Sequence, residues 1–458
     1  MSSFFAPPFG PLNGIHYLIQ HHARPLKASS AVDLLEALIP LYAQAFLLLS
    51  PSFLGPSTRL LRATLGLVGI LSLTNQFMSW RVVPPGANAL NTTLGSLYVH
   101  TVLKYAWFAL APGATDTLMF RAGRKRRSRA FAALDLCLNS RYTYVEFEPR
   151  EEESEKAAAG RRSSRSPSPP DRPTFPYTLS TASRAPVVMR HLLLGFLQIL
   201  AADTLLAIVR AAGPSTLGDP NSAQGKIATF LATTGFEVIP GIIDPCGLNE
   251  NRVELRQSVI EVLITLALGA APYLTMNGLY RLAAGLAIGS RLWEVESWEP
   301  DLFDSPWAAD SLLDFWRRWH GINKHDHALL RDTLLDVAGL PHTPFLTIPI
   351  TFIISGLLHI VYQLGMNPVP AATKVGGFFV ACAVGTFVEY SVYRATGSYV
   401  GGIIGRVWTW SFLYLAAGRY IVDAWVDAGV AATRLAEDDW ADALAVWILK
   451  YVLVPYAK

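Results

Sequence analysis

The sequence predicts an all-α, polytopic integral membrane protein with about eight to nine transmembrane helices. Hydrophobic residues make up 51% of the 458 positions and charged residues only 16%, against roughly 25% charged in an ordinary soluble protein. A soluble protein of this length needs more charge to cover its surface, so much of the apolar surface must face lipid. The composition excludes a nucleic-acid-binding basic protein, a disordered chain and a disulfide-framed secreted module.

Long apolar runs recur along the chain, each about the ~20 residues that cross a ~30 Å hydrocarbon core as a helix. The run at 256–290 is long enough for one bent crossing or two short ones, and a weaker candidate lies at 441–455. The other predicted spans are 34–54, 60–80, 90–112, 191–212, 342–365, 372–395 and 401–424. One such run alone could be a buried helix of a soluble protein, but eight or nine in one chain predict a membrane protein.

Charge is concentrated between the third and fourth predicted spans. Residues 121–172 carry 13 Lys/Arg and 8 Asp/Glu, a local net charge of +5, so the rest of the chain sums to −2 within the total of +3. Basic residues close to a span end favour the cytoplasmic side, which places the N-terminus in the lumen. Residues 150–173 combine like-charge runs with Ser and Pro, a composition typical of a disordered linker. The predicted regions are N-terminal transmembrane helices (1–120), a basic, partly disordered cytoplasmic insert (121–190) and a C-terminal transmembrane region (191–458).

Residues 292–341 bring charge, aromatic rings and histidine together outside the insert. Ser311 followed by Asp314 predicts a capping box at the start of a helix. Within that helix Asp314 can reach Arg317 or Arg318, at spacings of three and four. An interfacial amphipathic helix, with Trp at headgroup depth and Arg against lipid phosphates, explains the same pattern.

A polar stripe runs down the predicted span at 342–365. His359 lies deep in this apolar run. An ionisable side chain is costly inside a membrane, so His359 is a candidate functional residue. Residues at every fourth position form the stripe, and they are Thr347, Thr351, Ser355, His359 and Gln363. Ser and Thr could simply bond back to their own helix, and His359 could be a packing histidine. The length of the stripe favours a polar pathway or site.

These two elements carry a resemblance to a known family. The segment SLLDFWRRWHGI, which contains Trp316, Trp319 and His320, resembles the signature of wax-synthase-like proteins, a branch related to the membrane-bound O-acyltransferases. IISGLLHIV, which contains His359, resembles the second histidine motif of that family, and WEPDLFDSPWAADS resembles the stretch before the signature. The matching motifs lie within 297–365. The resemblance is strongest to fungal acetyltransferases of secondary-metabolite pathways.

The resemblance implies a membrane-bound O-acyltransferase (MBOAT) fold and an acyl-CoA-dependent enzyme, with transfer of an acyl group, most simply acetyl, to a hydroxyl of a hydrophobic acceptor such as a terpenoid. Histidine within reach of a hydroxyl can remove its proton, and burial in an apolar helix disfavours the charged imidazolium. We therefore expect His359 to be the base and His320 to polarise the thioester or orient the acceptor. The expected substrate-binding residues are Trp316, Trp319, Arg317, Arg318, Ser355 and Asp314.

The expected partners are acyl-CoA as cosubstrate, a hydrophobic alcohol and the lipid bilayer, with no nucleic acid, metal or further cofactor. Three cysteines, Cys137, Cys246 and Cys382, lack the spacing of a zinc site or a disulfide framework. The expected location is the endoplasmic reticulum membrane.

Three other functions are considered for the same sequence. A long-chain acyl-CoA:alcohol acyltransferase that makes wax or sterol esters uses the same motifs. A membrane di-iron desaturase needs several HxxxH or HxxHH boxes, which the spacing of His320, His325 and His327 does not match. A transporter is the non-enzyme alternative, because charged residues fall in or near predicted spans; they are Lys104, Asp203, Glu261 and Glu389. Transporters generally show paired repeats with broken helices, and pairing of Glu389 with Arg394 or an adjacent helix is a simpler explanation of that charge.

Overall fold

The computed structural model describes the chain as a series of helical stretches joined by short segments. The described residues are 24–25, 30–49, 56–81, 88–111, 113–116, 128–139, 145–147, 184–211, 250–298, 302–319, 324–364, 369–422, 424–425, 430, 440–441 and 444–445. His320 and the predicted linker at 150–173 lie outside the described residues, as does most of the weak candidate span at 441–455.

Four helices of the N-terminal part pack around one core. They are α2 (Ser30–Leu48), α3 (Pro56–Ser79), α4 (Asn88–Leu110) and α5 (Arg129–Leu138). Helix α5 lies inside the range predicted as the basic insert, and it is amphipathic, with Ala132, Ala133 and Leu136 buried in the core shared with α2 and α4. Part of the insert is therefore folded against the apolar helices.

Two small sheets accompany these helices. Strand β1 (Arg24–Pro25) pairs in parallel with β2 (Trp80–Arg81), and β3 (Ala114–Asp116) pairs antiparallel with β4 (Val145–Phe147), with Thr115 opposite Glu146. With strands of only two or three residues, the described part of the chain is helical, as predicted.

Buried cations close helix ends in this N-terminal group. Arg62 of α3, 1% exposed, donates from Nη1 to the carbonyl oxygens of Phe108 and, at 2.7 Å, of Ala111, at the end of α4. Lys104 of α4 is equally buried, and its ammonium group donates to three carbonyls at the end of α5, those of Leu136 (3.1 Å), Cys137 (2.6 Å) and Asn139 (3.0 Å). Carbonyls at a helix C-terminus have no partner within the helix and carry partial negative charge, so a cation suits them.

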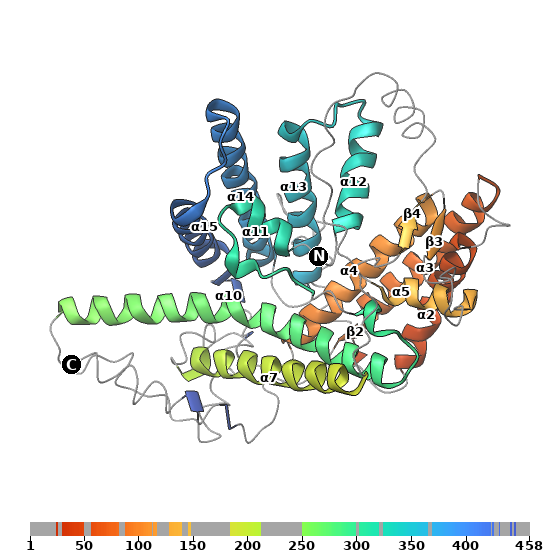
Figure 1. Cartoon of the computed structure of the whole chain (residues 1–458), viewed down its shortest axis with the longest axis horizontal. Helices are drawn as coiled ribbons and strands as arrows, with labels where there is room; N and C mark the ends of the chain where they lie inside the picture. Colours follow the sequence, from red (N-terminus) through yellow and green to blue (C-terminus); the bar gives the residue numbers. More distant parts are fainter. Residues whose placement is uncertain are drawn as a thin grey trace, which may run out of the picture.

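Helices α7 (Arg184–Ala211) and α10 (Glu250–Gly289) lie side by side and run across the direction of α13 and α14 (Figure 1). They approach closely because small residues face each other: a Cβ at Gly195 would lie 2.9 Å from the carbonyl oxygen of Gly278. The range 256–290 forms part of one continuous helix of 40 residues with Pro272 inside it, rather than two short ones.

The C-terminal unit holds the predicted motifs. Its elements are α11 (Leu312–Trp319), α12 (Lys324–Val337), α13 (Pro344–Gln363), α14 (Val369–Thr396), α15 (Gly402–Ala417) and the π-helical turn η6 (Gly418–Val422). Helices α13 and α14 are neighbours, and the short helix α11 packs on α14. The shared core includes Leu312, Phe315, Phe352, Phe379 and Cys382.

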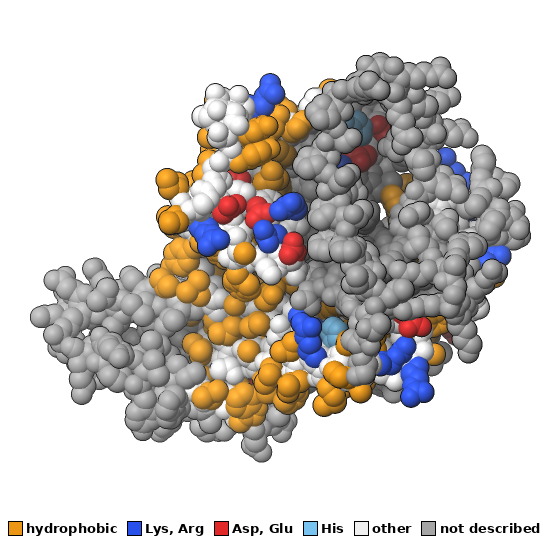
Figure 2. All heavy atoms as spheres, viewed as in Figure 1, with side chains coloured by type: hydrophobic (Ala, Val, Ile, Leu, Met, Phe, Trp, Pro, Cys, Tyr) orange, Lys and Arg blue, Asp and Glu red, His pale blue; other side chains and the backbone are white. Residues whose placement is uncertain are grey.

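Four helices of the described residues are long and apolar enough to cross a membrane. They are Thr58–Ser79, Arg184–Val209, Pro344–Val361 and Ala372–Thr396, with a shorter apolar helix at Leu35–Leu48. The predicted runs at 90–112, 256–290 and 401–424 also contain helices, namely α4, α10 and α15. The structure therefore supports an integral membrane protein, while the predicted total of eight or nine spans stays a prediction. On the face drawn in Figure 2, hydrophobic side chains cover much of the described surface, as a lipid-facing surface requires.

Candidate functional site

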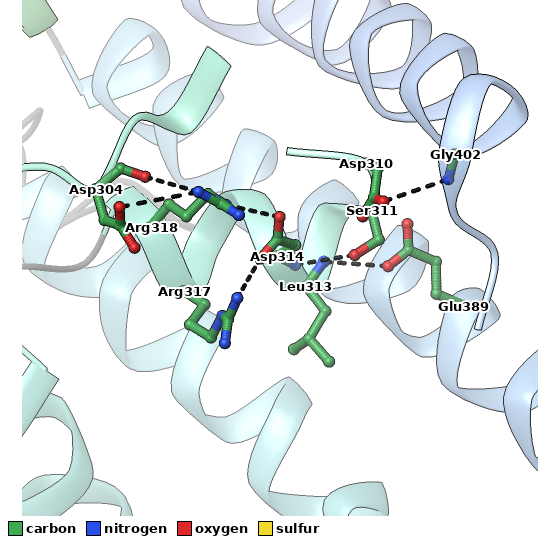
Figure 3. Close-up of polar contacts among 9 residues, drawn as sticks. All are labelled: Asp304, Asp310, Ser311, Leu313, Asp314, Arg317, Arg318, Glu389 and Gly402. Carbon is green, nitrogen blue, oxygen red and sulfur yellow. Dashed lines mark hydrogen bonds and ion pairs between the residues drawn. The ribbon is translucent and has the colours of Figure 1, made fainter. Parts of the chain in front are cut away.

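Helix α11 begins as the sequence predicts, with Ser311 at its N-cap. The hydroxyl oxygen of Ser311 accepts a hydrogen bond from the backbone N–H of Asp314 at 3.0 Å. Asp314 uses its carboxylate elsewhere, accepting from Arg317 Nη2 and from Arg318 Nε, both at 2.7 Å (Figure 3). The predicted ion pairs on α11 are thus confirmed, and of the predicted capping box the structure shows the half made by the hydroxyl of Ser311.

A second carboxylate reaches the same helix end from another helix. Glu389 of α14, 5% exposed, accepts from the backbone N–H of Leu312 at 2.7 Å and of Leu313 at 3.1 Å. Its Oε1 also accepts from Nε1 of Trp408 in α15 at 2.9 Å. The described partners of Glu389 therefore lie on α11 and α15. Of the two predicted pairings, with Arg394 or with an adjacent helix, the structure shows the second.

The C-terminal end of α11 is held as well. The backbone N–H of Asp304 donates to the carbonyl oxygen of Arg318 at 3.0 Å, and Arg318 Nη1 donates to the carbonyl oxygen of Asp304 at 3.2 Å. Burial of the Asp314 carboxyl acts to raise its pKa, but the hydrogen bonds from Arg318 and Arg317 outweigh burial and lower that pKa below its ordinary value. Both arginines on α11 form ion pairs with Asp314. The side chain of Arg317 is 68% exposed, so its other N–H donors can bind solvent or an anion.

Trp316 and Trp319 anchor α11 in an aromatic core. The Trp316 ring, 6% exposed, lies 5.5 Å from Phe352 of α13 and 5.9 Å from Phe379 of α14, between ring centroids. The Trp319 ring lies 4.9 Å from Phe303 in the segment before α11. Edge and offset ring pairs of this kind stabilise by about 0.5–1.5 kcal/mol each beyond the area they bury. Both residues therefore pack α11 into the unit, with Trp316 buried and Trp319 half-buried.

His359 lies in α13 beside the same aromatic core. Its Nδ1 is 2.7 Å from the carbonyl oxygen of Ser355, one turn earlier, and its ring lies 4.0 Å from the Phe379 ring. A carbonyl oxygen can only accept, so Nδ1 carries the proton of this hydrogen bond. In the neutral form of the ring this hydrogen bond leaves the lone pair on Nε2, which is the tautomer that a base needs.

The other side chains of the polar stripe are of two kinds. Some bond back to their own helix, and others are buried. Thr351 Oγ1 donates to the carbonyl oxygen of Thr347 at 2.7 Å, the back-bonding that the sequence left as an alternative. Ser355 is 1% exposed, and its hydroxyl has no hydrogen-bond partner among the described residues. Ser355 therefore has donor and acceptor capacity to offer beside His359.

A close approach of two helices sets the position of His359 relative to α14. A Cβ at Gly356 would lie 3.3 Å from both the carbonyl oxygen of Gly376 and the Cβ of Phe379. A contact of that length is tighter than most, so glycine at this place lets α13 and α14 come together. The crossing brings Phe379 onto the imidazole of His359.

The structure thus brings together most of the predicted site residues. Trp316 of α11 touches Phe379 of α14, which touches His359 of α13, and Ser355 lies one turn from His359. Arg317 and Arg318 lie on the outer side of α11 with Asp314 (Figure 3), and charged side chains gather there on the surface in Figure 2. His320 follows α11 directly and lies outside the described residues. Within the described residues no group of three or more His, Cys, Asp or Glu is placed to hold a metal ion.

Two members of the site escaped sequence reasoning. Phe379 has no feature that separates it from other aromatic residues of an apolar span. Glu389 is visible as a charge inside the apolar run 372–395, but two of its three described donors are backbone N–H groups 76 and 77 positions away, which no side-chain pattern reveals.

One comparison with known proteins gives a match. Residues 298–381 match the model of the membrane bound O-acyl transferase family. This range starts before α11, includes α12 and α13 with His359, and ends within α14. Comparisons with curated proteins and with solved structures give no match.

Proposed function

We propose that this protein is a membrane-bound O-acyltransferase that transfers an acyl group from acyl-CoA to a hydroxyl of a hydrophobic acceptor. The observation that carries the proposal is that the residues matched to the family also pack together in the structure. The family match at 298–381 covers α11, α13 and the first half of α14. These elements share one core, and Phe379 of that core lies against the ring of His359.

In the proposed reaction His359 is the general base. The lone pair on its Nε2 takes the proton of the acceptor hydroxyl as the oxygen attacks the thioester carbon. The tetrahedral intermediate collapses with cleavage of the carbon–sulfur bond, and the proton held by His359 neutralises the CoA thiolate as it leaves. The products are the ester and CoA with a free thiol, and a positioned base of this kind contributes roughly 10²–10⁴-fold to the rate.

Other residues have supporting roles in this scheme. We assign His320 to polarising the thioester carbonyl or orienting the acceptor, because it directly follows α11. The buried hydroxyl of Ser355, which lacks a described partner, is a donor for a substrate oxygen. Arg317 keeps donors free for the phosphates of CoA beside its bond to Asp314. A site among apolar helices also excludes the water that would hydrolyse the thioester.

We propose acetyl as the acyl group, a terpenoid or similar secondary metabolite as the acceptor, and the endoplasmic reticulum as the location. The support for these finer points is the likeness of the motifs around Trp316 and His359 to those of fungal acetyltransferases. The long-chain alternative requires palmitoyl-CoA or a similar donor and a fatty alcohol or sterol.

The test is thioester consumption by purified protein in nanodiscs. Acetyl-CoA or palmitoyl-CoA is supplied with a panel of terpenoid alcohols, sterols and fatty alcohols, while free CoA thiol and ester are measured by colorimetry and mass spectrometry. Release of CoA that depends on the alcohol and yields a matching ester supports the proposal, and the preferred donor decides between acetyl and long-chain transfer. A protein that moves an alcohol or its ester across vesicles without consuming thioester would be a transporter, and the proposed function would be wrong.

A further inference from the structure

Glu389 is a buried carboxylate to which the proposed chemistry gives no task. It lies on α14 beyond the end of the family match at residue 381, and it is 5% exposed. No Lys or Arg side chain of the described residues forms an ion pair with it. An isolated carboxylate in such a place is costly unless hydrogen bonds compensate it.

The start of α11 supplies that compensation. The first N–H groups of a helix have no partner within the helix, and they carry partial positive charge. Ser311 satisfies the N–H of Asp314, while Glu389 satisfies those of Leu312 and Leu313. The helix end is thus capped twice, once by its own chain and once by α14, and the second cap ties α11 to the helix that carries Phe379.

This tie reaches the proposed base through two ring contacts. Glu389 fixes the start of α11, and Trp316, in the next turn of α11, touches Phe379, whose ring lies 4.0 Å from that of His359. The other end of α11, which leads to His320, is held by the paired backbone and side-chain bonds between Arg318 and Asp304. Release of the start of α11 would let the whole short helix tilt relative to α14.

We propose that Glu389 is a positioning residue of the acyl-transfer site: its carboxylate locks α11 onto α14 and so sets the placement of Trp316 relative to Phe379 and His359. This inference rests on the proposed function. The interaction needs a carboxylate, because both oxygens accept from N–H donors. In Glu389→Gln the amide NH₂ would face one of these donors.

The first test compares Glu389→Gln with Trp408→Phe. The control removes only the Trp408 N–H bond to Glu389 and leaves both backbone bonds in place. We expect Glu389→Gln to lower kcat by about 10- to 100-fold, the size of effect that a misplacement of about 1 Å produces, with the KM for acyl-CoA within about threefold. Trp408→Phe should keep kcat within about threefold. A Glu389→Gln enzyme with wild-type kcat would overturn the inference.

A rescue experiment separates positioning from simple helix stability. In Glu389→Gln/Ser311→Asp, a local carboxylate at the N-cap restores an anionic cap to α11, but no bond to α14. Recovery of thermal stability without recovery of kcat supports positioning, and recovery of both would overturn it. If the melting temperature stays low in the double variant, its kcat is measured on the folded fraction, well below that temperature. A wild-type kcat under these conditions also overturns the inference.

Hydrogen exchange keeps the inference testable apart from activity. Peptides covering 309–319 should exchange faster in Glu389→Gln than in wild type or in Trp408→Phe, because the N–H groups of Leu312 and Leu313 lose an acceptor. Unchanged exchange there would overturn the tie to α14 even if no acyl transfer were found. Absence of acyl transfer in the wild type, with exchange altered as expected, would instead refute the proposed function.

Discussion

The N-terminal group of helices and the unit around α11 both contain charges that are buried among apolar helices, but of opposite sign. In the first group Arg62 and Lys104 close the carbonyl ends of α4 and α5. In the second, Glu389 closes the amide end of α11. Each sign matches the partial charge of the helix end that it meets.

The two regions differ in what the capped helix end contributes to, which is stability in the first and turnover in the second. The carbonyl ends of α4 and α5 lie in a core of packed helices, so loss of their cations should cost stability. The amide end of α11 lies one turn from Trp316 and next to the helix of Phe379, so its loss should cost turnover. Charges inside the spans therefore do not by themselves indicate a transport path, because Lys104 and Glu389, two of the residues that suggested one, serve helix ends.

The largest effect should follow from removal of the proposed base. His359→Ala leaves no group to take the hydroxyl proton, and we expect ester formation to fall by about 10²–10⁴-fold, while the protein purifies as wild type does. His342→Ala is the control, because His342 is exposed in the segment before α13 and its Nε2 lies 2.8 Å from the carboxylate of Asp336. Ester formation at a near wild-type rate in His359→Ala would make the polar stripe structural.

The next largest effect should come from the N-terminal group, and on stability rather than turnover. Arg62→Met leaves the carbonyls of Phe108 and Ala111 buried without this donor, which should cost about 1–3 kcal/mol. Arg59→Met is the matched control, one turn away on the exposed side of α3. Thermal unfolding in detergent should separate the two variants, with turnover of the folded protein alike in both. Reduced kcat without loss of stability in Arg62→Met would break the comparison between the regions.

The parts of this molecule that could be predicted from sequence are those decided locally. Apolar runs of about 20 residues predict helices because the thickness of the bilayer sets that length and a backbone in lipid must satisfy its hydrogen bonds within the segment. The Ser311 cap and the pairing of Asp314 with Arg317 and Arg318 follow from spacings of three and four residues. These features are correct in the structure, and so is the placement of His359 inside a helix.

The features that could not be predicted depend on which helices become neighbours. Burial of α5, taken for part of a basic insert, depends on the cores of α2 and α4. The contact of Phe379 with His359 depends on the crossing at Gly356, and the bonds of Glu389 join positions far apart in the chain. Sequence periodicity specifies the faces of a helix but not its partner, so these contacts become visible only in the folded molecule.

A smaller effect is expected from pH at Asp314. Its pKa is lowered in the folded protein by Arg318 and Arg317 despite partial burial, so its stabilising contribution is present above the ordinary carboxyl pKa of 3.8 and is lost as pH falls through the lower, folded value. The difference in melting temperature between wild type and Asp314→Asn should therefore stay constant from pH 8 to 5. It should correspond to about 1 kcal/mol or less, because α11 carries these ion pairs at the surface, where Arg317 is 68% exposed. A stability difference that shrinks already at pH 6 would contradict the lowered pKa.

Effects of similar, small size should come from two glycines that differ in their surroundings. A Cβ at Gly356 meets the backbone oxygen of Gly376 at 3.3 Å, so Gly356→Ala must push α13 and α14 slightly apart beside His359. We expect a loss of about 1 kcal/mol, at the low end of the cost of overpacking, together with a measurable fall in kcat. A Cβ at Gly269 of α10 meets nothing within 4 Å, so Gly269→Ala should gain up to about 1 kcal/mol from helix propensity and leave kcat unchanged. Thermal unfolding and steady-state rates of both variants check this pair, and a Gly356→Ala protein as stable and active as wild type would show that the crossing tolerates a methyl group and does not set the position of His359.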